Sequence, residues 1–328
     1  MQSRRILLMA SAVVFALPSI SGAQARRPFA LADLLGAVRL GDPQLSPDGK
    51  RVLFTRTTTV IATGKRNADI WSVPADGSAP ASMFIGGEKS ENTPRYSADG
   101  STLVFISTRD GAPQVYTAGA DGATPKRITK VSGGVQAPLI ISNDGKRIAY
   151  VVDVYPHCAD VACNARTRDA AEKDPVKMRT LTSLGYRHWD EWREGIRHHV
   201  YVTELATGAT HDVTPGDFDA PQHNYEDNAI AFSPDGATLA FSSNHDGRDK
   251  EMSSTNRDIF LVPVTGGSTR KLTTNPAADE QPLYSPDGRT LPCGRSGAPA
   301  TKPTAGISIC TTSRPARGRP CSRRSICR

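Results

Sequence analysis

The stretch Ser46-Pro47-Asp48-Gly49 decides the fold, because its Ser-x-Asp-Gly pattern recurs four more times along the chain. The other copies are Ser97-Ala98-Asp99-Gly100, Ser142-Asn143-Asp144-Gly145, Ser233-Pro234-Asp235-Gly236 and Ser285-Pro286-Asp287-Gly288. Successive copies begin 51, 45, 91 and 52 residues apart. Within such a stretch Asp can bond the nearby backbone, and Gly supplies the positive φ that closes a hairpin. The pattern therefore predicts five tight turns, each between two paired strands.

Short runs of β-branched and aromatic residues flank these turns, as at residues 139–141 and 147–151 around the third copy. A third run follows, a second turn comes next, and a short fourth run closes each unit, as at residues 258–273. Four strands in a repeat of roughly 40–50 residues are typical of a propeller blade. We therefore predict an all-β protein, a β-propeller with four four-stranded blades and the start of a fifth over residues 26–291, its ring incomplete. A sandwich built from unrelated hairpins is the alternative, which the two matched turns per unit disfavour.

The interval of 91 residues before the fourth copy is about twice the repeat. The second strand of the third blade ends near Asp153, and the pattern resumes at His198-His199-Val200-Tyr201-Val202. Residues 153–197 are therefore predicted to be an insertion between the second and third strands of the third blade.

Residues 1–25 have the features of an export signal. Arg4 and Arg5 precede an apolar run over residues 6–20, and Ala23-Gln24-Ala25 fits a cleavage site. The apolar run is short for a membrane span, so no stable membrane anchor is predicted. We expect cleavage after Ala25 and a periplasmic or secreted protein.

The formal charge of +7 is unevenly distributed. Residues 289–328 hold eight Arg, one Lys and no acidic residue, which leaves residues 1–288 mildly acidic. We therefore predict no nucleic-acid partner. Residues 292–328 are predicted to be a disordered basic tail. A genuine tail and out-of-frame translation are both open, and the break inside a blade favours the second, because natural boundaries fall in linkers.

Cys158 and Cys163 are the two cysteines that precede this tail. A disulfide between them suits an oxidising compartment. A metal site that includes His157 is the alternative, but one His beside a pair of cysteines five residues apart is a weak metal signal. We favour the disulfide and predict neither a metal nor a cofactor.

Two segments resemble one family. Residues 29–49, from Phe29 to the first turn, are similar to the opening of secreted dipeptidyl aminopeptidases and acylaminoacyl peptidases of the prolyl oligopeptidase serine peptidase family. The insertion segment Arg187-His188-Trp189-Asp190-Glu191-Trp192-Arg193-Glu194-Gly195 and the pair of Cys158 and Cys163 are similar to parts of the same propellers. The resemblance covers residues 29–291. Periplasmic propellers of the Tol system share the general blade motif, which leaves a non-enzymatic TolB-like interaction propeller as the alternative.

The resemblance implies a hydrolase domain after the propeller, with a nucleophilic Ser on a G-x-S-x-G elbow and an Asp and a His to activate it. The 328 residues contain no such elbow, and Gly294-Arg295-Ser296-Gly297-Ala298 breaks the pattern. No catalytic residue is therefore assigned. We expect a chain truncated before the hydrolase domain and inactive by itself, whose open propeller edge favours aggregation. A fragment without any function is a further alternative.

The resemblance also implies that peptides are the substrates of the intact parent and that the propeller controls access to its active site. A peptide ammonium in a partly buried cleft needs a paired carboxylate. Glu191 and Glu194 are the candidates for this role. The alternative is that Trp189 and Trp192 pack the insertion against the blade while both carboxylates are solvated.

Overall fold

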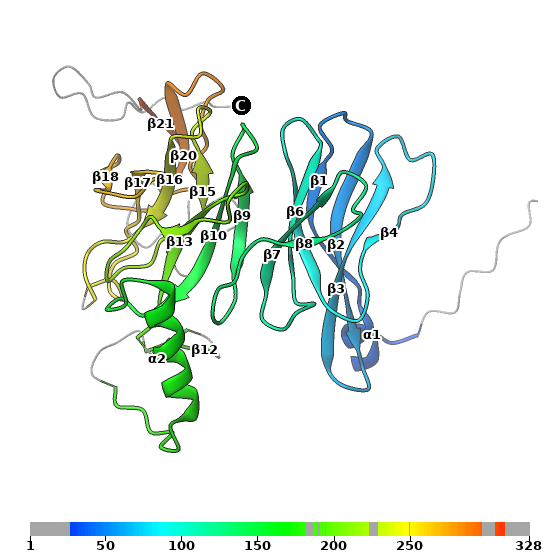
Figure 1. The fold of residues 1–328 in the computed structure, drawn as a ribbon, viewed down its shortest axis with the longest axis horizontal. Helices are drawn as coiled ribbons and strands as arrows, with labels where there is room; N and C mark the ends of the chain where they lie inside the picture. Colours follow the sequence, from blue (N-terminus) through cyan, green and yellow to red (C-terminus); the bar gives the residue numbers. More distant parts are fainter. Residues whose placement is uncertain are drawn as a thin grey trace, which may run out of the picture.

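The computed structural model describes residues 27–181, 186–188, 191–193, 195–222, 229–248, 250–296 and 306–311. In these ranges the chain forms four four-stranded antiparallel sheets, one three-stranded sheet and one two-stranded hairpin (Figure 1). The all-β propeller predicted from the repeats is confirmed, with four complete blades and part of a fifth.

The sheets follow one another along the chain. A short helix, α1 (Leu31–Gly36), precedes the first of them. The first blade contains β1 (Arg39–Leu45), β2 (Arg51–Val60), β3 (Lys65–Pro74) and β4 (Ser82–Ile85), and the second contains β5 (Glu91–Tyr96), β6 (Thr102–Ser107), β7 (Gln114–Gly119) and β8 (Lys126–Arg127). The third contains β9 (Gln136–Ile141), β10 (Arg147–Val154), β13 (Arg197–Glu204) and β14 (Thr210–Asp212), and the fourth contains β15 (Ile230–Phe232), β16 (Thr238–Ser243), β17 (Asp258–Pro263) and β18 (Arg270–Lys271).

Each Ser-x-Asp-Gly stretch forms the turn between the first and second strands of a blade. In the first copy Gly49 has a φ of 71°, and the Ser46 hydroxyl donates to Asp48 Oδ1 at 2.6 Å. The same Ser46 Oγ accepts the Arg51 N–H at 3.0 Å, at the start of β2. The serine hydrogen bond holds the pKa of the turn aspartate below its usual value, to about 2 for Asp99. The sequence predicted the roles of Asp and Gly but not that of the serine, which ties the turn to the following strand.

The apolar core lies between neighbouring blades. Alternate side chains of one strand point to opposite faces of its sheet. In β6, Leu103 and Phe105 therefore pack against the first blade, while Val104 and Ile106 pack against the third. The third and fourth blades share a core of the same kind that includes Phe241, which has no exposed surface. Each blade is thus stabilised by apolar contact with the next.

The strand pattern continues past Leu291, where the sequence predicted that it ends. β20 (Thr290–Arg295) pairs with β19 (Asp279–Glu280) and with β21 (Gly306–Thr311). Leu291 and Cys293 are buried against the fourth blade. Pro292 and Gly294 disfavour a strand, but the alternate apolar residues still face a neighbouring blade. Strand β20 thus runs to Arg295, and β21 also lies within the residues predicted as a tail. Residues 297–305 and 312–328 of the predicted tail lie outside the described residues.

The long segment of the third blade leaves the sheet after β10 and returns at β13. These two strands pair directly over eight residue positions. Between them lie α2 (Val161–Lys173), whose N-cap Asp160 accepts the Cys163 N–H at 2.7 Å, and the hairpin of β11 (Arg187–His188) and β12 (Glu191–Trp192). Figure 1 shows α2 and β12 beyond the end of the third sheet, on one side of the molecule. We call residues 155–196 the insertion.

The predicted signal, residues 1–25, lies outside the described residues. Among the helices of the described part, none is long and apolar enough to cross a membrane. Association through an open blade edge remains a prediction.

Candidate functional site

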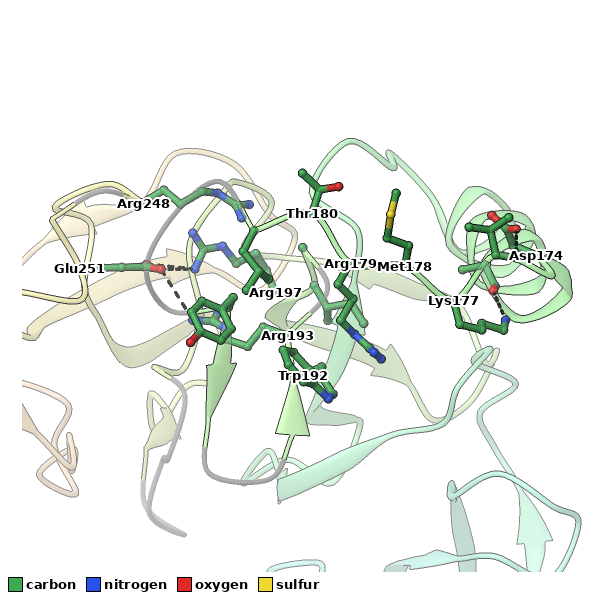
Figure 2. A pocket seen from close by; sticks show the side chains of 16 residues that line it. Asp174, Lys177, Met178, Arg179, Thr180, Trp192, Arg193, Arg197, Arg248 and Glu251 are labelled. Carbon is green, nitrogen blue, oxygen red and sulfur yellow. Dashed lines mark hydrogen bonds and ion pairs between the residues drawn. The ribbon is translucent and has the colours of Figure 1, made fainter.

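A cavity of about 500 Å³ lies where the insertion meets the third and fourth blades. Its walls come from the end of α2, the segment that follows it, the β11–β12 hairpin, the start of β13 and the loop before β17. Lining residues shown in Figure 2 include Met178, Arg179, Trp192, Arg193, Arg197, Arg248 and Glu251. The cavity has a charged end and an aromatic end, and these differ in how their side chains are held.

Arg197 is the centre of the charged end and is only 1% exposed. Its Nη1 lies 2.9 Å from both carboxylate oxygens of Glu251, and its Nε lies 2.8 Å from Asp217 Oδ1. Its Nη1 also lies 3.4 Å from Asp219 Oδ2. A buried guanidinium is tolerated only when carboxylates surround it in this way. Arg197 is the first residue of β13 in the third blade, while Glu251 belongs to the loop between β16 and β17 of the fourth. The ion pair of Arg197 with Glu251 therefore joins these two blades.

Two further arginines complete the cluster. Arg193, from the insertion, forms an ion pair with the fully buried Asp219, and Arg248 donates to both oxygens of Asp217 at 2.6 and 3.0 Å. The Arg248 hydrogen bond holds the pKa of Asp217 well below its usual range, at about 2. Burial raises the pKa of Asp219, but the charges of Arg193 and His198 outweigh it and the net shift is downward. Asp217 and Asp219 are therefore ionised at neutral pH, and all three carboxylates of the cluster are paired with arginines.

The aromatic end is more open. The rings of Tyr186 and Trp192 stack with their centroids 6.0 Å apart, and Arg179 Cζ lies 4.5 Å from the centre of the Trp192 ring. Trp192 is 42% exposed and Met178 is 78% exposed. Aromatic faces of this kind offer apolar contact and can also hold a cation. This end can therefore receive an apolar side chain of a ligand.

The two glutamates predicted to bind an ammonium are not tested by this geometry. Glu191 belongs to β12, next to Trp192, and its side chain lies outside the described residues. Glu194 and Trp189 lie outside them entirely. The ammonium-binding role of Glu191 and Glu194 therefore remains a prediction.

The central members of the charged cluster are not predicted by the sequence. Arg193 lies in the quoted insertion segment, but Arg197, Asp219 and Glu251 have no motif that marks them. Asp219 and Glu251 come from separate loops and meet Arg197, at the start of β13, only in the folded chain. The one available signal was Arg197, a charged residue at the start of an otherwise buried strand.

Cys158 and Cys163 are joined by a disulfide that closes the segment leading into α2. In the described part of the chain no group of three or more His, Cys, Asp and Glu side chains is arranged to hold a metal ion.

Comparison with known proteins agrees with this architecture. Residues 30–169 match the model of the TolB beta propeller domain. The chain is 31% identical over 264 residues to dipeptidyl-peptidase 5 of Porphyromonas endodontalis, which corresponds to 79% of this chain and 37% of that protein. The chain thus spans little more than a third of the length of this relative.

Solved structures share the fold at low sequence identity. An acylaminoacyl peptidase of Pyrococcus horikoshii superposes with a TM-score of 0.57 at 14% identity, over 84% of this chain and 38% of that chain. A TolB structure from Agrobacterium tumefaciens superposes with a TM-score of 0.50 at 18% identity, over 84% of this chain and 77% of that chain. The repeated turns, the blades between them and the sequence match together show that this chain is a TolB-like propeller homologous to the corresponding region of dipeptidyl-peptidase 5.

Proposed function

We propose that this propeller selects substrates for an exported serine exopeptidase of the dipeptidyl or acylaminoacyl peptidase type. The observation that carries the proposal is the cavity of about 500 Å³ at the insertion, in a propeller homologous to that of a dipeptidyl-peptidase. Ligand-binding cavities commonly have volumes of about 300–1,000 Å³, and the polar groups in their lining fix the orientation of the ligand. The cavity would receive the end of a peptide before it reaches a catalytic serine.

The ammonium of the peptide needs a carboxylate that is free to pair with it. Glu251 does not supply one, because it is 8% exposed and both of its oxygens accept from Arg197. Glu191 adjoins the cavity-lining Trp192 in sequence, and Glu194 follows three residues later. We therefore assign binding of the peptide ammonium to Glu191 and Glu194. Contact with an apolar side chain of the same peptide is assigned to Trp192 and Tyr186.

Peptide binding tests this assignment directly. A short fluorescent peptide with a free amino terminus should bind the 328-residue chain, and its N-acetylated form should bind about tenfold more weakly, which corresponds to about 1.4 kcal/mol. Glu191→Gln should remove that difference. Glu88→Gln, an exposed change in the loop between β4 and β5, is the matched control and should leave the difference intact. Equal binding of the free and acetylated peptides would overturn the ammonium assignment.

Turnover is a separate expectation. Acyl transfer from a peptide needs an activated serine, its base and an oxyanion hole in one constellation. The printed sequence has no G-x-S-x-G elbow, so we expect no hydrolysis of dipeptidyl or acylaminoacyl substrates and no labelling by a fluorophosphonate probe. Stoichiometric labelling of a serine in this chain would contradict the division of labour proposed between propeller and hydrolase.

Export can be tested by the amino terminus of the mature protein. Protein recovered from the periplasm should begin at Arg26 if residues 1–25 are removed as a signal.

The match to the TolB beta propeller domain over residues 30–169 favours a non-enzymatic propeller that binds proteins as the second candidate. That candidate predicts no difference between free and acetylated peptides, together with binding of a folded partner through the blade loops.

A further inference from the structure

One polar group at the charged end of the cavity is left without a partner. Arg197 Nη2 is buried and makes no hydrogen bond with any described residue, although Nε and Nη1 of the same side chain are fully engaged. A buried N–H group without an acceptor destabilises the folded chain, and it does so more strongly when the group is charged. Native structures rarely leave such a group unpaired unless a water or ligand completes it.

The acceptors around this group are already used. Glu251 and Asp217 accept from arginines through both oxygens, and Asp219 accepts from Arg193, Arg197 and the His198 N–H. The cavity wall nevertheless carries the guanidinium groups of Arg193, Arg197 and Arg248 together, at the end seen on the left of Figure 2. This end therefore has N–H donors in excess and lacks an acceptor.

We propose that the arginine end of the cavity is a subsite for a carboxylate carried by the peptide, from an Asp or Glu side chain or from a free C-terminus. The proposal rests on the function proposed above and narrows its substrates to acidic peptides. Arginine matches this ligand because its planar fork can bind both oxygens of a carboxylate.

A ligand would reach the subsite beside its most exposed ion pair, that of Arg248 with Asp217. The side chains of Arg248 and Asp217 are 41% and 52% exposed, whereas those of Arg193, Arg197 and Glu251 are at most 12% exposed. An ion pair this exposed contributes little in water, so Arg248 can exchange its carboxylate partner at small cost. Asp217 Oδ1 also accepts from Arg197 Nε, so a ligand carboxylate that replaces Asp217 on Arg248 would pair with Arg197 as well, the residue whose Nη2 lacks an acceptor.

The two ends of the cavity together define the ligand. Trp192 and Tyr186 contact an apolar residue, while the arginines bind the carboxylate. The preferred ligand is a short peptide with an apolar residue near an acidic group. Uncharged peptides lack the group that would pair with the arginines.

Three fluorescent peptides test the subsite in the full 328-residue chain. All share a free amino terminus and one apolar residue: the first has Glu and a C-terminal amide, the second Gln and a C-terminal amide, and the third Gln and a free C-terminus. The Glu peptide should bind at least tenfold more tightly than its amidated Gln counterpart if the carboxylate comes from a side chain. The Gln peptide with the free C-terminus should show that advantage instead if it comes from the chain end.

Arg248→Gln should reduce the advantage of the carboxylate, measured as the ratio of the affinities of the Glu and amidated Gln peptides for the same chain, to less than threefold. Arg66→Gln, an exposed change in β3 of the first blade, is the matched control and should keep the full advantage. Equal binding of all three peptides would overturn this inference and leave the proposed function standing. Absence of binding by every peptide would overturn both. An Arg248→Gln chain that loses all three peptides equally would show that Arg248 supports the cavity and does not read the carboxylate, which also overturns the inference.

Discussion

The blades and the insertion of this protein are held together by different forces. Between blades the contacts are apolar and repeat with the period of the strands, as between Phe105 and Leu53 or between Phe241 and Val200. The insertion contains a short helix, a disulfide and a hairpin, and ion pairs of Arg193 fasten it to the blades. The four blades and their apolar contacts form the frame of the molecule. This frame tolerates substitutions at its edges, whereas a buried ion cluster requires every partner. This difference predicts which substitutions unfold the chain and which alter only the site.

The largest expected effect is in the frame. Phe241 has no exposed surface, and its ring stacks on that of Phe260 with the centroids 5.7 Å apart. Phe241→Ala should lower the free energy of unfolding by about 3–5 kcal/mol, through lost transfer energy and the cavity that remains. Chemical denaturation followed by circular dichroism measures this change.

Met178→Ala is the matched change in the insertion. Its side chain is 78% exposed, so the free energy of unfolding should change by no more than about 0.5 kcal/mol. Similar losses in the two variants would mean that the insertion is part of the cooperative frame, and the contrast between the two regions would fail.

The next effect is at the junction of the two regions. Arg197→Leu leaves Asp219 and Glu251 buried with only Arg193 to pair with them. Removal of one member of a buried ion cluster should cost about 3 kcal/mol, and thermal melting measures it. Arg187→Leu, an exposed change in β11, controls for loss of a positive charge. An Arg197→Leu chain that melts like the control would show that the cluster adds no stability.

The frame was predictable from the sequence, and the charged site was not. The Ser-x-Asp-Gly turns and alternating strands depend on neighbours within a few residues, so their pattern appears in the sequence itself. The insertion was located because it interrupts this period. Asp219 and Glu251 meet Arg197 from different loops, and their contact depends on how two blades pack. At Leu291 and Cys293 the sequence predicted no strand where the structure has one. Burial against the neighbouring blade outweighs the weak strand propensity of Pro292 and Gly294 there.

A smaller and local effect is expected from the disulfide of the insertion. Cys158→Ser opens a loop whose closure contributes about 2 kcal/mol in the chain-entropy estimate. Amide exchange in α2 should accelerate accordingly, while exchange in β16 and β17 should stay unchanged if the insertion opens as a unit of its own. Mass mapping without reductant should find Cys158 linked to Cys163. Free thiols at both positions, or stoichiometric zinc that protects them, would contradict the disulfide in solution.

The smallest effect concerns His245, on the loop that follows β16. Its ring lies between Phe218 and Phe260, with centroids 3.9 Å from each. Desolvation by these rings, and then the charge of Lys271, lowers the pKa of His245 to about 4. An unfolded histidine titrates near pH 6.5, roughly its unperturbed pKa. Folding therefore favours the neutral ring, and its contribution is complete above about pH 6.5 and is lost as the pH falls towards 4.

Nuclear magnetic resonance titration of the His245 ring should give a midpoint near pH 4, the pKa that its packing favours. The difference in melting temperature between the natural chain and His245→Gln should change only between about pH 6.5 and 4, since glutamine does not titrate. His211, whose Nε2 bonds the Val264 carbonyl at 2.7 Å, serves as a second histidine in the same spectra. A His245 midpoint near 6.5 would mean that the loop leaves the two rings in solution. The aromatic contacts of His245 would then not hold the loop that carries Arg248 and Glu251.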